Sequence, residues 1–196
     1  MSVAGWARNK VAHFDLIEPD AIAQFSDHYE ATIGDVDFDI PGWNWPRCGQ
    51  SMTLTVGPSG AGKSTWSEAQ GIEVVSSDAI RKERSPDGET AGSQSEIFHE
   101  VRTRSSKVLR EGRSVIVDAM HIEPEDRLRQ LAVAPADLNI KYAIIDRPLS
   151  EKQRDGGWRE KAGLVDKYHR LFSERSGEAL SGDGRNDVEV IDLRTS

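Results

Sequence analysis

The chain has 196 residues, of which 37% are hydrophobic and 30% are charged, and these values suit one medium-sized domain with some decoration. Its formal net charge of −8 at pH 7 argues against general binding to nucleic acid, and no run reaches the roughly 20 apolar residues of a membrane helix. Cys48 is the one cysteine and the N-terminus lacks the apolar core of a signal peptide, so we exclude an intrachain disulfide and expect a cytoplasmic protein.

Residues 1–50 predict an N-terminal extension packed on the core. Within it, residues 18–34 are typical of a short helix, with a proline near the start and a glycine at the end. The connector "PGWNWPRCG" then places Trp43 and Trp45 in a turn-rich stretch. We favour the interpretation that both indoles hold the extension to the core. The alternative is an aromatic platform that stacks a nucleobase.

Residues 51–56 alternate apolar side chains with threonines and predict a strand. The next eight residues, "GPSGAGKS", fit the spacing Gly-x-x-x-x-Gly-Lys-Ser of a phosphate-binding P-loop between a strand and a helix. An ordinary glycine-rich turn would not need the lysine at this fixed spacing. Residues 51–196 therefore predict a P-loop phosphotransferase domain that binds a nucleoside triphosphate.

The chemistry of phosphate binding predicts a role for each residue of this loop. Glycines let successive backbone N–H groups converge on one anion, and a helix N-terminus adds positive potential. Lys63 is expected to reach the β- and γ-phosphates, and Ser64 to place its hydroxyl on Mg²⁺. The predicted nucleotide contacts are Gly57, Ser59, Gly60, Ala61, Gly62, Lys63, Ser64 and Thr65.

A second strand over residues 72–75 leads into a helix over residues 77–84, with Ser77 or Asp78 as its N-cap. In this helix Asp78 and Arg81 are three residues apart and share a face. A hydroxyl acceptor of a phosphoryl group needs a base for its proton and a cation for orientation, which these two supply. The alternative is a capping aspartate beside a surface arginine.

Further along, a helix over residues 93–112 ends at a glycine, a third strand covers residues 114–119, and residues 124–134 predict another helix. Asp118 ends the third strand in the Walker-B-like context, in which a carboxylate reaches Mg²⁺ or its waters. Alternatively, Asp118 only caps the next segment.

The fourth strand, residues 140–146, is followed by a segment rich in basic residues around Gly156-Gly157. Arginines on a mobile segment can neutralise a triphosphate and exclude water, so residues 147–162 predict a lid. A solvated charged helix is the alternative. With a fifth strand at residues 187–193, strands and helices alternate, which predicts an α/β fold with a mostly parallel sheet and a ligand site at the carboxyl ends of the strands.

Four stretches in this order resemble the P-loop polynucleotide 5′-hydroxyl kinases and their zeta-toxin-like relatives: "GPSGAGKST", "SSDAIRKE", "LREGRSVIVDAMHIEPEDR" and "DRPLSEKQRDGGWRE". The resemblance implies a five-stranded parallel sheet and ATP or GTP with Mg²⁺ as the donor. It further implies that Asp78 is the general base, that Arg81 grips a phosphate of the acceptor, and that Arg154 and Arg159 are lid arginines. Where family members commonly have Asp-Ala-Thr-Asn, this chain has Asp118-Ala119-Met120-His121.

The leading hypothesis is a kinase that moves the γ-phosphate of a nucleoside triphosphate to a 5′-hydroxyl end of RNA or DNA. Its catalytic residues would be Lys63, Asp78, Arg81, Arg154 and Arg159, with Ser64 and Asp118 at the metal. A small-molecule kinase that phosphorylates a nucleotide sugar would use the same lysine and aspartate with a different acceptor pocket. A non-catalytic nucleotide-binding switch is the third hypothesis.

Overall fold

A computed structural model describes residues 49–85, 92–135, 138–155 and 162–195. The expected N-terminal extension, with Trp43 and Trp45, lies outside these residues. So do the predicted lid arginine Arg159 and the glycine pair beside it. Within the described ranges, no helix is long and apolar enough to cross a membrane.

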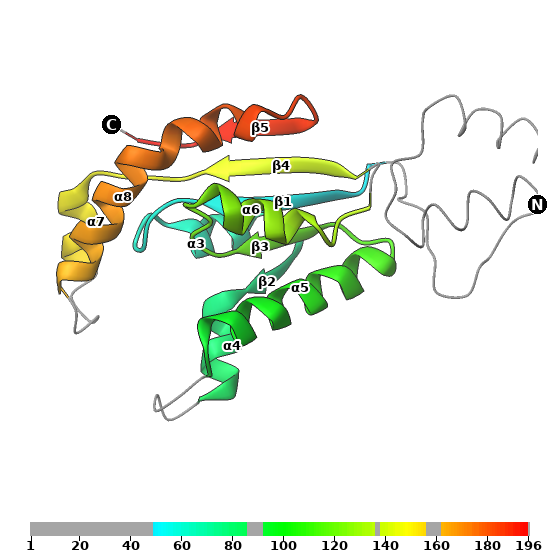
Figure 1. Ribbon diagram of the computed structural model, residues 1–196. Coiled ribbons are helices and arrows are strands. Elements are labelled where there is room, and N and C mark those ends of the chain that lie inside the picture. The colour runs from blue at the N-terminus through cyan, green and yellow to red at the C-terminus, as the bar shows by residue number, and fades with distance from the viewer. Residues whose placement is uncertain (1–48, 86–91, 136–137, 156–161, 196) are drawn as a thin grey trace, which may run out of the picture. The chain divides into compact units, whose positions relative to one another are not determined.

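The core is one five-stranded sheet with the order β2-β3-β1-β4-β5, in which all neighbouring strands pair in parallel (Figure 1). The predicted parallel sheet flanked by helices is thereby confirmed. Residue 72, which we assigned to the second strand, precedes that strand. The strands are β1 (Ser51–Val56), β2 (Glu73–Ser76), β3 (Val115–Asp118), β4 (Asn139–Ile144) and β5 (Val188–Asp192).

The central strand β1 is buried along its whole length because helices cover both faces of the sheet. Its alternating apolar side chains, such as Met52 and Leu54, join the larger hydrophobic cluster. A smaller cluster of Ala61, Ala143 and Ile145 packs against the first turns of the P-loop helix. Alternation along each strand therefore supplies two apolar layers, one for each face.

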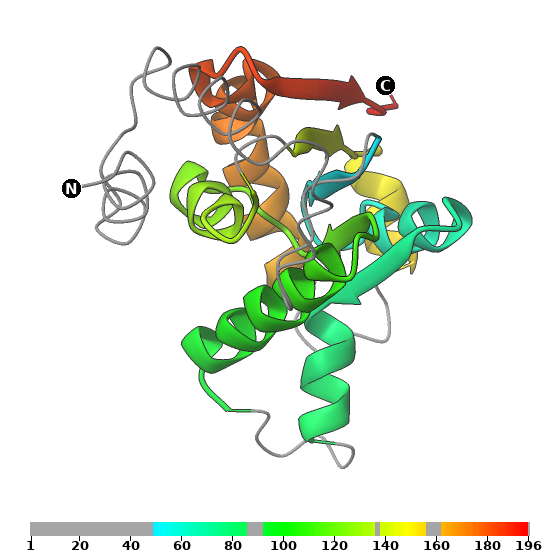
Figure 2. The same ribbon diagram turned by 90° about the vertical axis from the view of Figure 1, so that its right-hand side faces the viewer.

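Figure 2 shows α5, α6 and α8 on one face of the sheet and α3 on the opposite face. Sequence reasoning gave no helix to residues 162–180, yet Val165 and Phe172 of α8 are buried and recur at a helical spacing. The helices are α3 (Lys63–Ala69), α4 (Ser77–Arg84), α5 (Gln94–Arg110), α6 (Pro124–Leu131), α7 (Leu149–Asp155) and α8 (Ala162–Leu180), followed by the short 3₁₀ helix η1 (Gly182–Gly184).

The ends of α5 are fixed by two local motifs. At its start, Ser93 and Glu96 form a reciprocal capping box. At its end, Gly112 adopts φ 74° and donates its N–H to the Leu109 carbonyl, while Arg113 donates to the Val108 carbonyl. This pair of bonds is the Schellman motif, so the predicted glycine stop is confirmed.

The start of α4 differs from the sequence-based prediction by one residue. Its N-cap is Ser76, whose hydroxyl accepts a hydrogen bond from the backbone N–H of Ala79, and not Ser77 or Asp78. Strand β2 runs directly into this helix, so the last strand residue takes the capping role. Asp78 is therefore a residue of the first turn, and its exposed carboxylate lines the cavity described below.

Candidate active site

The P-loop connects β1 to α3 through glycines that no other residue could replace without rearrangement. Gly60 and Gly62 adopt φ values of 81° and 96°, in the region that favours glycine. A Cβ on Gly57 would lie only 2.0 Å from the Ile145 carbonyl oxygen. Gly57 therefore lets β1 and the end of β4 approach closely beneath the loop.

Lys63 is the first residue of α3 and is largely buried. Its Nζ donates a hydrogen bond to the Pro58 carbonyl oxygen at 2.7 Å, which folds the side chain over the loop. This geometry keeps the ammonium group at the anion-binding loop, where the sequence predicted it.

Asp118 ends β3 beside the P-loop helix and is 5% exposed. Its Oδ2 accepts hydrogen bonds from Ser64 Oγ at 2.8 Å and from Ser76 Oγ at 3.2 Å. Thr55 Oγ1 lies 3.4 Å from its Oδ1. Hydroxyls from three elements thus hold one carboxylate at the carboxyl edge of the sheet, and the sequence-predicted pair of Ser64 and Asp118 is in direct contact.

This all-oxygen arrangement fits Mg²⁺, which takes few protein ligands and keeps several waters and phosphate oxygens. Across the described ranges no cluster of three or more histidine, cysteine, aspartate or glutamate side chains is suited to a metal.

Asp78 and Arg81 lie on α4 and form an ion pair with 2.8 Å between Oδ1 and Nη1. The Asp78 side chain is 68% exposed. Arg81 also donates from Nη2 to Gln94 Oε1 at 2.7 Å, which ties α4 to the start of α5. The arginine is thereby held from two sides while the carboxylate stays accessible.

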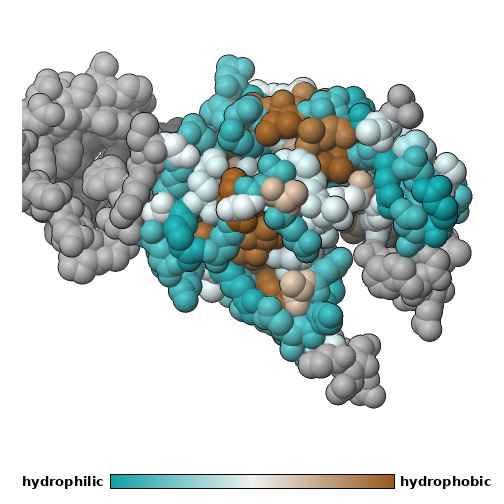
Figure 3. Space-filling view, turned by 180° about the vertical axis from the view of Figure 1, so that it is seen from behind, coloured by the Kyte–Doolittle hydropathy of each residue, from teal (hydrophilic) through white to brown (hydrophobic). Residues whose placement is uncertain are grey.

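A cavity of about 690 Å³ brings these groups to one space. Figure 3 shows the molecule from behind, hollowed between the part that carries α4 and the part that carries α7 and α8. Gly57 and Ala61 are buried beneath the loop rather than on this wall. The predicted site residues that line the cavity are Ser59, Gly60, Gly62, Lys63, Ser64, Thr65, Asp78, Arg81 and Asp118.

Arg147, which follows β4, is hydrogen-bonded to the P-loop. Its Nε donates to the Gly60 carbonyl oxygen at 2.7 Å, and its Nη1 pairs with Asp155 at 2.6 Å. Arg154, the predicted lid arginine, is 72% exposed and lies 3.4 Å from Asp155. The assignment of Arg154 to the donor phosphates stays a prediction, and sequence reasoning did not single out Arg147 as a site residue.

Lys152 was counted among the charges of the lid, but its side chain is fully buried. Its Nζ contacts Asp146 Oδ1 at 2.5 Å and His169 Nδ1 at 2.7 Å. A Cβ on Gly60 would lie 3.5 Å from the Lys152 Cβ. This lysine therefore joins β4, α7 and α8 directly behind the P-loop. In the sequence, the one signal for this contact is Asp146, the aspartate at the end of the fourth predicted strand.

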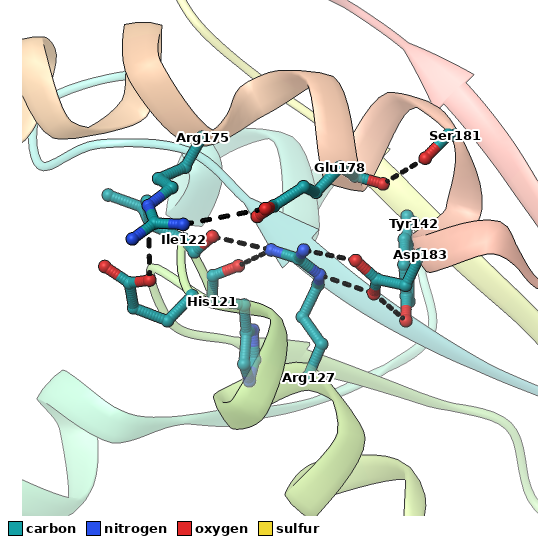
Figure 4. A network of polar contacts seen from close by, with 9 residues as sticks. His121, Ile122, Arg127, Tyr142, Arg175, Glu178, Ser181 and Asp183 are labelled. Atoms are coloured by element: carbon teal, nitrogen blue, oxygen red, sulfur yellow. Dashed lines mark hydrogen bonds and ion pairs between the residues drawn. The ribbon is translucent and has the colours of Figure 1, made fainter.

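A second buried cation, Arg127, joins α6 to the 3₁₀ helix η1 (Figure 4). Its Nε and Nη2 bind the two carboxylate oxygens of Asp183 at 2.8 and 2.5 Å. The Tyr142 hydroxyl donates to the same carboxylate at 2.9 Å, and burial together with Asp183 raises the pKa of that hydroxyl. Arg127 Nη1 donates to the carbonyl oxygens of His121 and Ile122, at 2.7 Å each. The loop between β3 and α6 is thus fixed to the end of α8.

The rest of the cavity wall is mostly apolar and acidic, and part of it adjoins the P-loop, since Gly57 donates its N–H to the Met120 carbonyl oxygen at 3.0 Å. The Phe98 side chain from α5 and the Tyr168 side chain from α8 contribute aromatic rings, and Glu123 and Asp126 contribute carboxylates. The remaining apolar members of this wall are Met120, Ile122, Leu164, Val165 and Leu171. Sequence reasoning did not assign these residues to the site because they come from four separate parts of the chain: α5, the loop after β3, α6 and α8.

Comparisons with known proteins agree with this fold. The chain is similar to the crystal structure of a sugar kinase from Janibacter sp. HTCC2649, with 18% identity, a TM-score of 0.52, and 74% of this chain and 85% of that chain covered. It is also similar to a chain in the structure of the Pnkp1/Rnl/Hen1 RNA repair complex, with 17% identity and a TM-score of 0.56. That match covers 66% of this chain and 46% of that one.

Structural similarity at 17% and 18% sequence identity shows the fold alone. No curated protein matches the chain. Residues 52–169 match the family AAA_33, described as an AAA domain. Because this match includes the P-loop, Asp78, Asp118 and more than half of the sequence, the chain belongs to the AAA_33 family.

Proposed function

We propose that the protein is a kinase that transfers the γ-phosphate of a nucleoside triphosphate to a hydroxyl group. One observation carries this proposal: the P-loop and the Asp78–Arg81 pair line the same cavity from different elements. A nucleotide switch would need the loop and its metal ligands but not an accessible carboxylate and guanidinium across from them.

On the donor side, the loop N–H groups and Lys63 would bind the phosphates of ATP or GTP. Ser64 and Asp118 would hold Mg²⁺, whose charge would offset that of the phosphates. Arg147, already on the Gly60 carbonyl, is close enough to the loop to orient it.

On the acceptor side, the Asp78 carboxylate would take the proton of the attacking hydroxyl. The acceptor oxygen then bonds to the γ-phosphorus while the bond from that phosphorus to the β–γ bridging oxygen breaks, and a nucleoside diphosphate leaves. Arg81, held by Gln94, would orient the acceptor or offset charge on the transferred group.

Two acceptor classes remain, and each has a supporting observation. A 5′-hydroxyl end of RNA or DNA is supported by Arg81, whose guanidinium fork suits a phosphate. However, nucleic-acid grooves track a phosphate backbone with several cations. Among the described residues that line the cavity outside the P-loop, Arg81 and Arg147 are the cations, and Arg147 is paired with Asp155. Glu123 and Asp126 add negative charge. This lining favours a compact, uncharged hydroxyl compound.

A screen with γ-labelled ATP tests the proposal. The acceptors are glycerol, ribose, adenosine and an oligonucleotide with a 5′-hydroxyl end, with Lys63→Ala as the inactive control. Label on a small compound is the expected result. Label on the oligonucleotide, with a KM that rises steeply with salt, would establish the nucleic-acid class instead. ATP hydrolysis with no labelled product under any condition would refute the kinase proposal and support the switch.

A further inference from the structure

His121 is an unusual residue on the cavity wall. It lies three residues after Asp118, and its backbone adopts φ 43°. A positive φ is uncommon for a residue with a Cβ, and it costs free energy that the surrounding contacts must offset. The side chain is also almost completely buried, so both its backbone and its ring are tightly constrained.

Neighbouring groups fix His121 at two points. Arg127 donates to its carbonyl oxygen at 2.7 Å, as Figure 4 shows. Its ring Nδ1 lies 3.0 Å from the carbonyl oxygen of Thr55. A backbone carbonyl can only accept a hydrogen bond, so Nδ1 must carry the proton. In the neutral ring, Nε2 is then a bare acceptor.

The electrostatic surroundings keep the ring neutral. Burial lowers the pKa of His121 to about 4, and the nearby charges of Arg127 and Lys63 act in the same direction. The hydrogen bond to Thr55 acts in the opposite direction but does not offset them. At neutral pH, Nε2 therefore accepts hydrogen bonds and does not donate them.

Among the protein atoms of the described ranges, Nε2 has no hydrogen-bond partner. The Phe98 ring stands edge-on to the imidazole, with 6.3 Å between the ring centroids, and both residues line the cavity. A buried acceptor without a partner costs stability and calls for an explanation. Here the explanation is a ligand in the cavity, because His121 lines that cavity beside the phosphate-binding loop.

We infer that Nε2 of His121 accepts a hydrogen bond from a second hydroxyl or amine of the acceptor substrate, beside the hydroxyl that is phosphorylated. This inference rests on the proposed function and deepens it. The preferred substrates are then compounds with at least two donor groups, such as a sugar, a polyol or a nucleoside. His121 acts as a specificity residue, and a substrate that lacks the second donor leaves Nε2 unpaired.

The first test uses ¹⁵N-labelled histidine and NMR on the full chain. The chain has five histidines, and His121→Asn identifies the signal of His121 by removing it. We expect a proton on Nδ1, and a shift of the Nε2 signal when glycerol, ribose or adenosine is added with Mg²⁺ and a non-hydrolysable ATP analogue. A proton on Nε2, or a signal that none of these compounds moves, overturns the inference.

The second test is kinetic. It uses one compound from the acceptor screen described above that the wild-type protein phosphorylates. Asparagine places an amide near Nδ1 and tolerates positive φ, whereas glutamine places one near Nε2. His121→Asn should raise the KM for that acceptor about three- to tenfold, the loss of one neutral hydrogen bond, with the KM for ATP unchanged. His121→Gln should restore part of the affinity.

An unchanged acceptor KM in His121→Asn, with unfolding temperature and ATP affinity as in the wild type, overturns the inference. The proposed function can fail separately. If no compound is phosphorylated but ribose or adenosine still shifts the Nε2 signal, the kinase proposal is wrong and the binding role of His121 stands.

Discussion

At the residue scale, the Asp78 carboxylate combines high exposure with one close cation. It is 68% exposed and pairs with Arg81 at 2.8 Å, a contact that contributes little to stability at such exposure. Its importance should therefore lie in catalysis. The capping role that the sequence suggested belongs to Ser76, which leaves the carboxylate accessible.

Asp78→Asn should slow phosphoryl transfer by about a hundredfold or more, because it removes the positioned base and leaves the shape of the site unchanged. The measurement is a single-turnover rate together with the affinity for ATP. Lys82→Ala, an exposed change on the same helix, is the matched control. If ATP affinity falls together with the rate, Asp78 supports the nucleotide site and is not the base.

Two arginines after β4 are predicted to act at different stages. Arg147 already binds the Gly60 carbonyl, so Arg147→Lys should weaken ATP binding. Arg154 is exposed and, within the described residues, is paired with Asp155, so Arg154→Lys should lower kcat more than ATP affinity if it joins the phosphates in the transition state. If Arg154→Lys has the same kcat and the same ATP affinity as the wild type, this arginine is only a surface charge.

At the element scale, the strands and the helices between them could be predicted because their patterns are local. Alternation identified β1, a glycine stop identified the end of α5, and both are confirmed. Helix α8 was missed because the charged residues that precede it were taken as one mobile lid. Its buried positions recur at a spacing that could have been found.

The buried cations could not be predicted from the sequence in the same way. Arg127 and Lys152 look like solvent-exposed charges in the sequence, and the partner of Arg127, Asp183, is 56 residues away. Nothing in a local pattern distinguishes a buried, paired arginine from an exposed one. The exposed Arg129 on the same helix illustrates the point.

Arg127→Met should destabilise the fold by about 3–5 kcal/mol, because the Asp183 carboxylate and two carbonyls lose their buried partner. Urea unfolding measures this, and Arg129→Met should change stability by less than about 0.5 kcal/mol. The double variant Arg127→Met/Asp183→Asn should recover part of the loss, since no buried charge is then left alone, asparagine tolerates the positive φ of residue 183, and its amide oxygen can still accept from Tyr142. If Arg127→Met is as stable as the wild type, the Arg127–Asp183 pair contributes nothing to the stability of the fold.

At the scale of the whole molecule, the sequence predicted a parallel sheet but not the order of its strands. That order depends on which strand each crossover reaches, and this is decided by packing between distant segments. The order β2-β3-β1-β4-β5 puts the strand before the P-loop in the middle. It also brings the ends of β3 and β4 to either side of the loop.

The central place of β1 sets how the loop can fluctuate. The backbone amides of β1 lie in a strand that is paired on both edges and covered on both faces. They should therefore exchange with deuterium only when the whole domain unfolds. Strands β2 and β5, at the sheet edges and partly exposed, should exchange sooner by local opening. The P-loop thus begins on the most persistent part of the molecule and ends on α3, a helix of seven residues. Opening of the loop should start from its α3 end, and β1 amides that exchange as fast as those of β5 would contradict this.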